Sequence, residues 1–266
     1  MKRVFLIISI FLFNSLQAQD TAQTSSSAQR EIDLITYPVL WHQTSAEYRA
    51  LCYQAFNTAR TYLEAILPVR QPNEKYAIIT DLDETIIDNS YMEARDIKEG
   101  KVYNSVGWKK WVSMSAATGI PGAVNFLQWA AKRNITIFYI SNRNTSDVKT
   151  TLLNLKKLCL PNADEEHMLF QTDTSTKEPR RLQVAENFKI VMLMGDNLND
   201  FSHLFEKRTI ADRKAEVDKV HDLWGKKFIV LPNAIYGEWE SAIYDYDRKL
   251  TPQQKDAKRK ENLTGY

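Results

Sequence analysis

Short apolar runs, each followed by polar or acidic residues, recur through the middle of the chain. The four runs cover residues 76–80, 135–140, 190–194 and 228–231. Helical spacing of apolar residues lies between them, most clearly over 123–133, 146–158 and 179–187. Strands that alternate with helices in this way predict an α/β fold with a parallel sheet covered on both faces. In such open sheets, ligands bind beyond the carboxyl ends of the strands.

A long amphipathic helix is predicted ahead of the first run. Residues 44–47 read Thr-Ser-Ala-Glu, which is typical of a capping box at a helix start. Apolar residues then recur at helical spacing from Tyr48 to Ile66, and Pro68 ends the pattern. We expect this apolar stripe to pack into the core.

The first 18 residues have the pattern of an export signal. Lys2 and Arg3 precede an apolar run from Val4 to Phe13, and small residues follow up to Ala18. The run is too short to span a bilayer, and a buried N-terminal helix is the alternative interpretation. No cysteine lies near this exit, so we expect a periplasmic or secreted protein without a lipid-anchor cysteine.

The expected organisation follows from these patterns and from a change in composition near each end. It comprises a signal peptide (1–18), a flexible polar leader (19–31), a single domain (32–248) and a charged C-terminal tail (249–266). Residues 40–67 and an insert at 88–120 are expected to form a smaller helical portion of the domain. The tail is either a solvated helix or a frayed end.

Charge is nearly balanced, with 35 basic and 33 acidic residues and a formal net charge of +2. Loss of residues 1–18 removes Lys2 and Arg3 and leaves equal numbers of each sign. Such a chain has no broad field to attract nucleic acid polymers or anionic membranes, so a small molecule is the expected partner. The sequence leaves a homodimer open. It also leaves open a disulfide between Cys52 and Cys159, although Cys52 lies on an apolar helical face.

Asp81 and Asp83 follow the first predicted strand directly, with Thr85 two residues later. Because side chains alternate with period two, both carboxylates can face one crevice. One can attack phosphorus while the other donates and accepts a proton. Two acids this close repel each other unless a cation or a shared proton lies between them. In isolation the motif is equally compatible with an ordinary acidic turn.

Two further clusters supply groups that bind a phosphoryl oxygen. Ser141, Asn142 and Arg143 follow the second strand, where a hydroxyl and backbone N–H groups can hold phosphate, although a simple turn explains them alone. Lys177 stands at a predicted helix start and could neutralise phosphoryl charge. The rival lysines for this role are Lys156, Lys157 and Lys189.

The fourth cluster, residues 195–200, reads Gly-Asp-Asn-Leu-Asn-Asp after the third strand. Asp196 at the strand end and Asp200 about one turn later could both point into the crevice. Their hard oxygen ligands suit magnesium. The alternative is a helix cap in which Asp196 or Asn197 accepts backbone N–H bonds. The four clusters together supply a nucleophile, a proton shuttle, phosphate donors and metal ligands.

These motifs, in this order, resemble those of the haloacid dehalogenase (HAD) superfamily. Residues 39–48, 81–89, 195–201 and 231–240 are further similar to the class C bacterial acid phosphatases of the lipoprotein e type. The resemblance spans roughly residues 35–245. Lipoprotein members carry a cysteine after the signal, and this chain lacks it there, which puts membrane anchoring in doubt.

The resemblance implies a Rossmann-like core with a smaller helical cap portion, and an acid phosphatase or 5′-nucleotidase activity through an aspartyl-phosphate intermediate. It makes Asp81 the nucleophile and Asp83 the general acid and base. It implies Mg²⁺ held by Asp81, Asp196 and the backbone carbonyl of Asp83, with Asp200 in support. The predicted phosphate-binding residues are Thr85, Ser141, Asn142 and Lys177.

The family's preference for nucleoside 5′-monophosphates implies an aromatic side chain beside the base. Tyr236 matches the family position, and the alternative is a tyrosine that packs in the core or a loop. Tyr91, Trp108 and Trp111 are candidates for the opposite wall.

The sequence has two alternatives to a phosphatase with an aspartate nucleophile. Phosphatases with a histidine nucleophile or a two-metal centre need histidine motifs that His42, His167, His203 and His221 do not form. A catalytically silent binding or storage protein on the same fold would be expected to have lost the nucleophile or a metal aspartate, and Asp81, Asp83 and Asp196 are all present.

Overall fold

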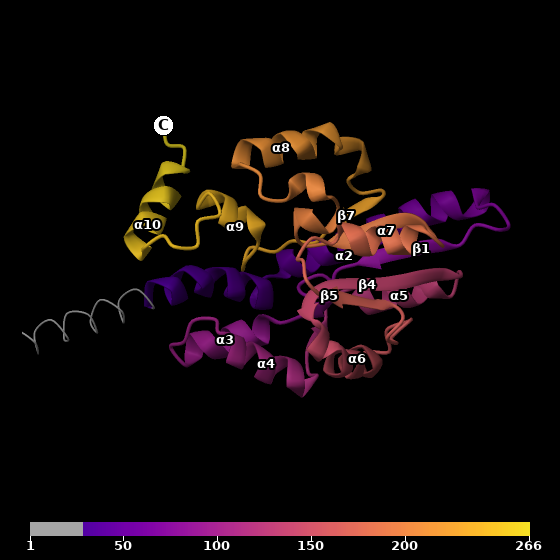
Figure 1. The fold of residues 1–266 in the computed structure, drawn as a ribbon, viewed down its shortest axis with the longest axis horizontal. Helices are drawn as coiled ribbons and strands as arrows, with labels where there is room; N and C mark the ends of the chain where they lie inside the picture. The colour runs from indigo at the N-terminus through magenta and orange to yellow at the C-terminus, as the bar shows by residue number, and fades with distance from the viewer. Residues whose placement is uncertain (1–28) are drawn as a thin grey trace, which may run out of the picture.

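A computed structural model describes residues 29–266 (Figure 1). The predicted export signal and most of the predicted leader lie outside the described residues. The centre of the molecule is a five-stranded sheet in the order β5-β4-β1-β6-β7, with every neighbouring pair parallel. The α/β fold class with a parallel sheet is therefore confirmed.

The strands of this sheet are β1 (Tyr76–Thr80), β4 (Ile135–Asn144), β5 (Met168–Gln171), β6 (Lys189–Gly195) and β7 (Phe228–Val230). A separate antiparallel pair is formed by β2 (Ile87–Asp88) and β3 (Thr118–Gly119). The helices are α2 (Ala46–Ile66), α3 (Ser90–Lys98), α4 (Ser105–Met114), α5 (Ala123–Ala131), α6 (Val148–Lys157), α7 (Glu178–Ala185), α8 (Ile210–Lys219), α9 (Glu238–Ile243) and α10 (Pro252–Glu261).

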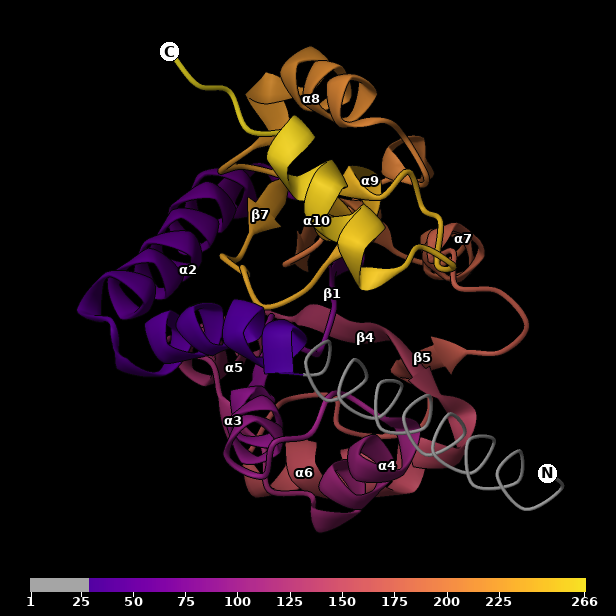
Figure 2. The ribbon, with the colours of Figure 1, turned by 90° about the vertical axis from the view of Figure 1, so that its left-hand side faces the viewer.

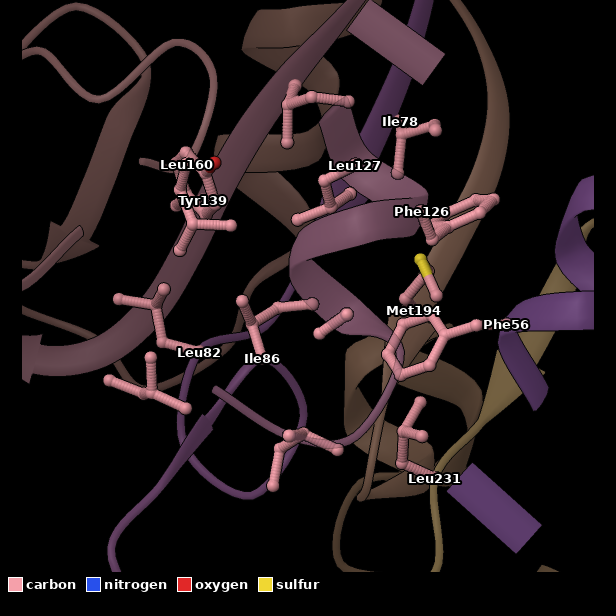
Figure 3. Packing of buried hydrophobic residues seen from close by; sticks show 14 of the residues in the cluster. Phe56, Ile78, Leu82, Ile86, Phe126, Leu127, Tyr139, Leu160, Met194 and Leu231 are labelled. Atoms are coloured by element: carbon pink, nitrogen blue, oxygen red, sulfur yellow. The ribbon is translucent and has the colours of Figure 1, made fainter. Parts of the chain in front are cut away.

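Alternation along β1 divides the core into two layers. Ile78 packs with residues of α2 and α5, including Phe56 and Phe126, as Figure 3 shows. Its neighbour Ile79 packs on the other face with residues of α7 and α8. Because successive side chains of a strand point to opposite faces, a strand covered on both sides is apolar throughout. This explains the unbroken apolar run of residues 76–79.

The chain order places β1 at the topological switch point. From β1 the chain moves to β4 and β5 on one side, and then returns to β6 and β7 on the other. Crevices at the carboxyl ends of strands around such a point bind ligands. Helices α3 and α4, from the predicted insert, lie next to each other away from the sheet (Figures 1 and 2).

Three local predictions are wrong. Residues 29–44 are already helical, and α2 begins after Ser45, whose side chain accepts from the backbone N–H of Tyr48, so Thr44 is not the cap. The predicted leader therefore overlaps a helix at residues 29–31. The second strand does not end at Ile140 but continues as β4 to Asn144. The strand β5 was not predicted, because its apolar run, Met168 to Phe170, is only three residues long.

The C-terminal segment is a helix without buried residues, as one of the two predictions for the tail expected. Residues 252–261 form this helix, α10, and Arg259 Nη1 donates to Oη of Tyr244, the residue after α9, at 2.6 Å. The two cysteines do not pair. Cys52 is buried, Cys159 is exposed, and both are free thiols. Among the helices of residues 29–266, none combines the length and apolar character needed to cross a bilayer.

Candidate active site

Three carboxylates from two strand ends meet in one group. Asp81 follows β1 directly, Asp196 follows β6, and Asp200 ends a short 3-10 turn at Leu198–Asp200. One carboxylate oxygen from each lies within 4.8 Å of the others. Hard oxygen ligands that converge at this spacing fit a divalent cation such as Mg²⁺.

Gly195 is what allows this close approach. A Cβ at Gly195 would lie 2.2 Å from Asp200 Oδ2, so a larger residue would displace that carboxylate. Asp200 Oδ2 also accepts from the backbone N–H of Asn197 at 3.0 Å. The backbone of the motif therefore fixes one carboxylate of the group before any ligand binds.

Lys177 lies at the first position before α7 and joins two of the carboxylates. Its Nζ donates to Asp81 Oδ1 and, at 2.6 Å, to Asp200 Oδ1. Although burial opposes its charge, Asp200 and Asp81 raise the pKa of Lys177 to about 12. One ammonium faces three carboxylates, so the group retains a deficit of positive charge. The rivals lie elsewhere: Lys157 donates to Ser115 O and Lys189 to Glu74.

The pKa values of Asp81 and Asp196 reflect this deficit of positive charge. Burial raises the pKa of Asp81 to about 7, with Asp200 and Asp83 adding to the shift and Lys177 opposing it. Burial, followed by Asp200 and Asp81, raises the pKa of Asp196 well above its usual range. A cation bound among the three side chains would favour their ionised forms and relieve the repulsion. The donor set therefore fits a metal by both geometry and charge.

Asp83 has separate partners. Arg143 donates from Nη2 and Nε to Asp83 Oδ1 at 2.7 and 3.1 Å, and Asn89 Nδ2 donates to the same oxygen at 2.7 Å. Arg143 and Asn89 are linked in turn at 3.3 Å, and Trp111 Nε1 donates to Asn89 Oδ1 at 2.8 Å. These contacts hold the Asp83 carboxyl in one orientation beside Asp81.

Of the remaining predicted phosphate-binding residues, one lines the cavity of the site and two are fully buried. Asn142 lines the site cavity and accepts from Arg180 Nη2 at 2.7 Å. Ser141 and Thr85 are fully buried. Ser141 Oγ lies 3.4 Å from Asp83 Oδ2, whereas Thr85 Oγ1 donates to Asp196 Oδ1 at 3.2 Å. Thr85 therefore contacts a candidate metal ligand, and a direct phosphate contact by its side chain stays a prediction.

A cavity of about 640 Å³ opens above these groups. Asp81, Asp83, Lys177, Asp196 and Asp200 line its polar end. Its other lining residues include Ile35, Glu93, Tyr103, Trp108 and Tyr236. A polar reaction end beside an aromatic wall is the usual form of a site for a ligand with a ring.

Tyr236 makes a contact that the sequence did not indicate. Its hydroxyl donates to Glu84, a buried glutamate whose backbone has a φ of 55°. Burial and the neighbouring Asp83 and Asp196 raise the pKa of Glu84 well above its usual range. Tyr236 is 37% exposed and lines the cavity. The ring is thus held by its hydroxyl and remains available to a ligand.

Of the three aromatic candidates for the opposite wall, Trp108 lines this cavity. Arg143 lies over its ring at 5.1 Å. Trp111 is buried and stacks with Tyr91 at 6.3 Å between ring centroids. These two form a packed pair on α3 and α4 instead of a wall of the cavity.

Sequence reasoning missed several contacts. Asn89, Glu84 and Asn233 were not singled out, yet Asn233 Nδ2 donates to Asp196 Oδ2 at 2.7 Å. All three stand in segments noted for their resemblance, which was the signal available. The four histidines pair with acidic side chains near them, for example His42 with Asp88 at 3.2 Å. None belongs to the carboxylate group found in residues 29–266.

Comparison with known proteins shows one consistent relationship. Residues 13–239 match the family model described as HAD superfamily, subfamily IIIB (acid phosphatase). The structure of the class C acid phosphatase from Bacillus anthracis is similar to this chain with a TM-score of 0.84 and 38% identity, covering 89% of this chain and 99% of that one. The same enzyme with tungstate bound matches with a TM-score of 0.84 and 38% identity, over 88% and 98% of the two chains.

Proposed function

The chain belongs to subfamily IIIB of the HAD superfamily, the acid phosphatases, and we propose that this phosphoric monoester hydrolase is exported, uses Mg²⁺ and forms a phosphorylated Asp81. The observation that carries the proposal is the group of Asp81, Asp196 and Asp200 within 4.8 Å, opposed by one buried lysine. Export is supported by the N-terminal pattern of Lys2 and Arg3 before an apolar run.

In the proposed reaction, an oxygen of Asp81 attacks the phosphorus of the monoester. The ester P–O bond breaks, and the leaving oxygen takes a proton from Asp83. Water then attacks the phosphorus of the aspartyl-phosphate while Asp83 accepts a proton of that water. The bond from phosphorus to the Asp81 oxygen breaks, which releases inorganic phosphate and restores the Asp81 carboxylate. Arg143 and Asn89 orient the Asp83 carboxyl for both steps through the bonds at 2.7 Å.

Charge on the transferred phosphoryl group is balanced from two sides. Lys177 contacts Asp81 and Asp200 and is placed to approach an equatorial phosphoryl oxygen. Asp81 and Asp196, with Asp200 in support, would hold Mg²⁺, which supplies Lewis acid stabilisation of phosphoryl charge when bound. The Bacillus anthracis relative binds tungstate, which is an oxyanion like phosphate, and this supports an oxyanion as a ligand of this chain as well.

We further propose nucleoside 5′-monophosphates as substrates. The aromatic wall of Tyr236 and Trp108 lies in the same cavity as the proposed nucleophile. Stacking of a base on an aromatic ring contributes about 1 to 3 kcal/mol and is tolerant of base identity. The cavity volume of about 640 Å³ is of the size that small-molecule sites have.

The test is a phosphate-release screen with the purified chain. AMP, a sugar phosphate and p-nitrophenyl phosphate are compared in Mg²⁺, in excess chelator, and in chelator followed by excess Mg²⁺. We expect all hydrolysis to stop in chelator and to return with Mg²⁺, with AMP hydrolysed at the highest kcat/KM. Activity that persists in chelator would reject the metal role. A catalytically silent protein would release no phosphate from any ester.

A further inference from the structure

Glu93 is a buried carboxylate without a partner in the described part of the chain. It lies on α3 and is 9% exposed. Among residues 29–266, no N–H or O–H group donates to it, and no cation pairs with it. Asp96 lies on the same helix and takes the nearby cation, because Arg95 donates to it from Nη2 at 2.6 Å and from Nε at 2.9 Å.

An unpartnered buried acid is costly to keep. A carboxylate loses its hydration on burial, and the loss is offset only by hydrogen bonds or a counter-charge. Burial, with a further contribution from Asp96, raises the pKa of Glu93 to about 7. Neither carboxylate oxygen of Glu93 is among the fully enclosed unpartnered atoms of residues 29–266, so the carboxylate opens to the cavity that it lines. A ligand in that cavity can therefore donate hydrogen bonds to it.

Glu93 stands between two cavities. One is a separate cavity of about 350 Å³ that Asp96 and Lys101 also line. The other is the cavity of Asp81, Lys177, Trp108 and Tyr236. Glu93 therefore shares one space with the group that would attack phosphorus and with the rings that would flank a base. In a nucleoside 5′-monophosphate, the ribose is the part that joins the phosphate to the base.

We propose that Glu93 determines specificity for the sugar by accepting hydrogen bonds from the 2′- and 3′-hydroxyls of the leaving nucleoside. This inference rests on the proposed function. A carboxylate has two oxygens with lone pairs directed outward, which match the two O–H groups of a ribose cis-diol. Dinucleotide-binding folds use an acidic residue on ribose hydroxyls in the same way. The phosphoryl chemistry itself does not require Glu93.

The experiment compares three esters that differ in what they offer to Glu93. AMP has both hydroxyls, 2′,3′-dideoxy-AMP has neither, and p-nitrophenyl phosphate has no sugar. At pH 8, where Glu93 is ionised, we expect wild-type kcat/KM to favour AMP over the dideoxy analogue by about tenfold or more, as expected for hydrogen bonds to a charged acceptor. In Glu93→Ala that ratio should fall to within about twofold, and p-nitrophenyl phosphate hydrolysis should stay within about twofold of wild type.

Two controls separate recognition from folding. Glu93→Gln keeps the shape and one acceptor oxygen, so its ratio should be intermediate. Glu99→Ala removes a glutamate at the end of the same helix that pairs with Lys101 on the surface, and it should leave all three rates unchanged. Thermal unfolding of each variant confirms that the fold is kept.

The outcomes are distinct. An unchanged ratio in Glu93→Ala, or an equal loss on all three esters, would overturn the role of Glu93 and leave the proposed function standing. A wild-type enzyme that cleaves p-nitrophenyl phosphate but not AMP would overturn the nucleotide substrate and the ribose contact together.

Discussion

Two sets of buried acids differ in how their negative charge is balanced. The strand-end cluster, which we define as Asp81, Asp196 and Asp200, is held by Lys177 and has its oxygens within 4.8 Å. The α3 pair, Glu93 and Asp96, has one cation, and that cation contacts Asp96 alone. Both sets have members whose pKa burial raises to about 7, namely Asp81 and Glu93.

The two sets differ in the kind of ligand that can satisfy their buried carboxylates. In the strand-end cluster, three carboxylates converge on one point. The proposed divalent cation would balance their charge and leave Asp81, the proposed nucleophile, free to attack. In the α3 pair, Glu93 faces a cavity without a converging second acid, so neutral donors on a ligand complete it. Both sets contain buried acids. The arrangement of the neighbouring groups decides which set is suited to catalysis and which to ligand recognition.

The largest effect should follow a change in the strand-end cluster. Asp81→Asn removes the nucleophile but keeps the shape of the side chain, so kcat should fall by at least about a thousandfold for every ester. Phosphate release measures the loss, and thermal unfolding shows that the fold is retained. Near-normal turnover would mean that Asp81 is not the attacking group, and the distinction between the two sets would fail.

A smaller and selective effect is expected at the aromatic wall. Tyr236→Ala should raise KM for AMP by roughly tenfold, and by much less for a small aliphatic phosphate, because a stacked base contributes about 1 to 3 kcal/mol. Steady-state kinetics on both substrates measure the difference.

Tyr236→Phe is the matched control, since it keeps the ring and removes the bond to Glu84. It should retain most of the AMP affinity. If both variants raise KM equally on the two substrates, the hydroxyl bond to Glu84 accounts for the effect and stacking is excluded.

The smallest effect concerns stability at the α3 pair. The pKa of Glu93 is raised to about 7 from an ordinary value near 4.5, so the unfolded state binds fewer protons between these pH values. Stability therefore falls as pH rises through this window. Glu93→Gln should stabilise the protein by about 1 to 3 kcal/mol at pH 8 and by much less at pH 5.

Denaturant unfolding at the two pH values measures this, with Glu99→Gln as the control. The pKa of Glu99 is lowered by its bond to Lys101, so that variant should give no gain at pH 8. An equal effect of Glu93→Gln at both pH values would show that Glu93 is ionised without penalty in the fold.

Much of the fold was predictable because its signals are local. The apolar runs of β1, β4, β6 and β7 reflect burial on both faces, which leaves an unbroken apolar pattern in the sequence. β5 was not predictable in this way, since its apolar run of Met168, Leu169 and Phe170 is too short to distinguish a strand from other structure. The N-terminal helix before Ser45 was missed because Pro38 stands inside it, and an interior Pro disfavours a helix.

The active-site residues also fall into those with a local signal in the sequence and those without one. Asp81, Asp196 and Lys177 stand at strand ends or a helix start, so topology alone brings them to one edge of the sheet. The bond from Arg143 to Asp83 and the bond from Tyr236 to Glu84 join residues 60 and 152 positions apart. Such pairings depend on how loops and rotamers pack in the folded protein, and no local pattern encodes them.

The most direct test of the account is to find where the phosphoryl group is carried during turnover. Enzyme quenched in acid during hydrolysis of p-nitrophenyl phosphate with Mg²⁺ is reduced with borohydride, which converts an aspartyl-phosphate to homoserine, and is then mapped by mass spectrometry. The account predicts homoserine at position 81 in the wild type and none in Asp81→Asn. A phosphoryl group on another residue, with Asp81 unmodified, would contradict it.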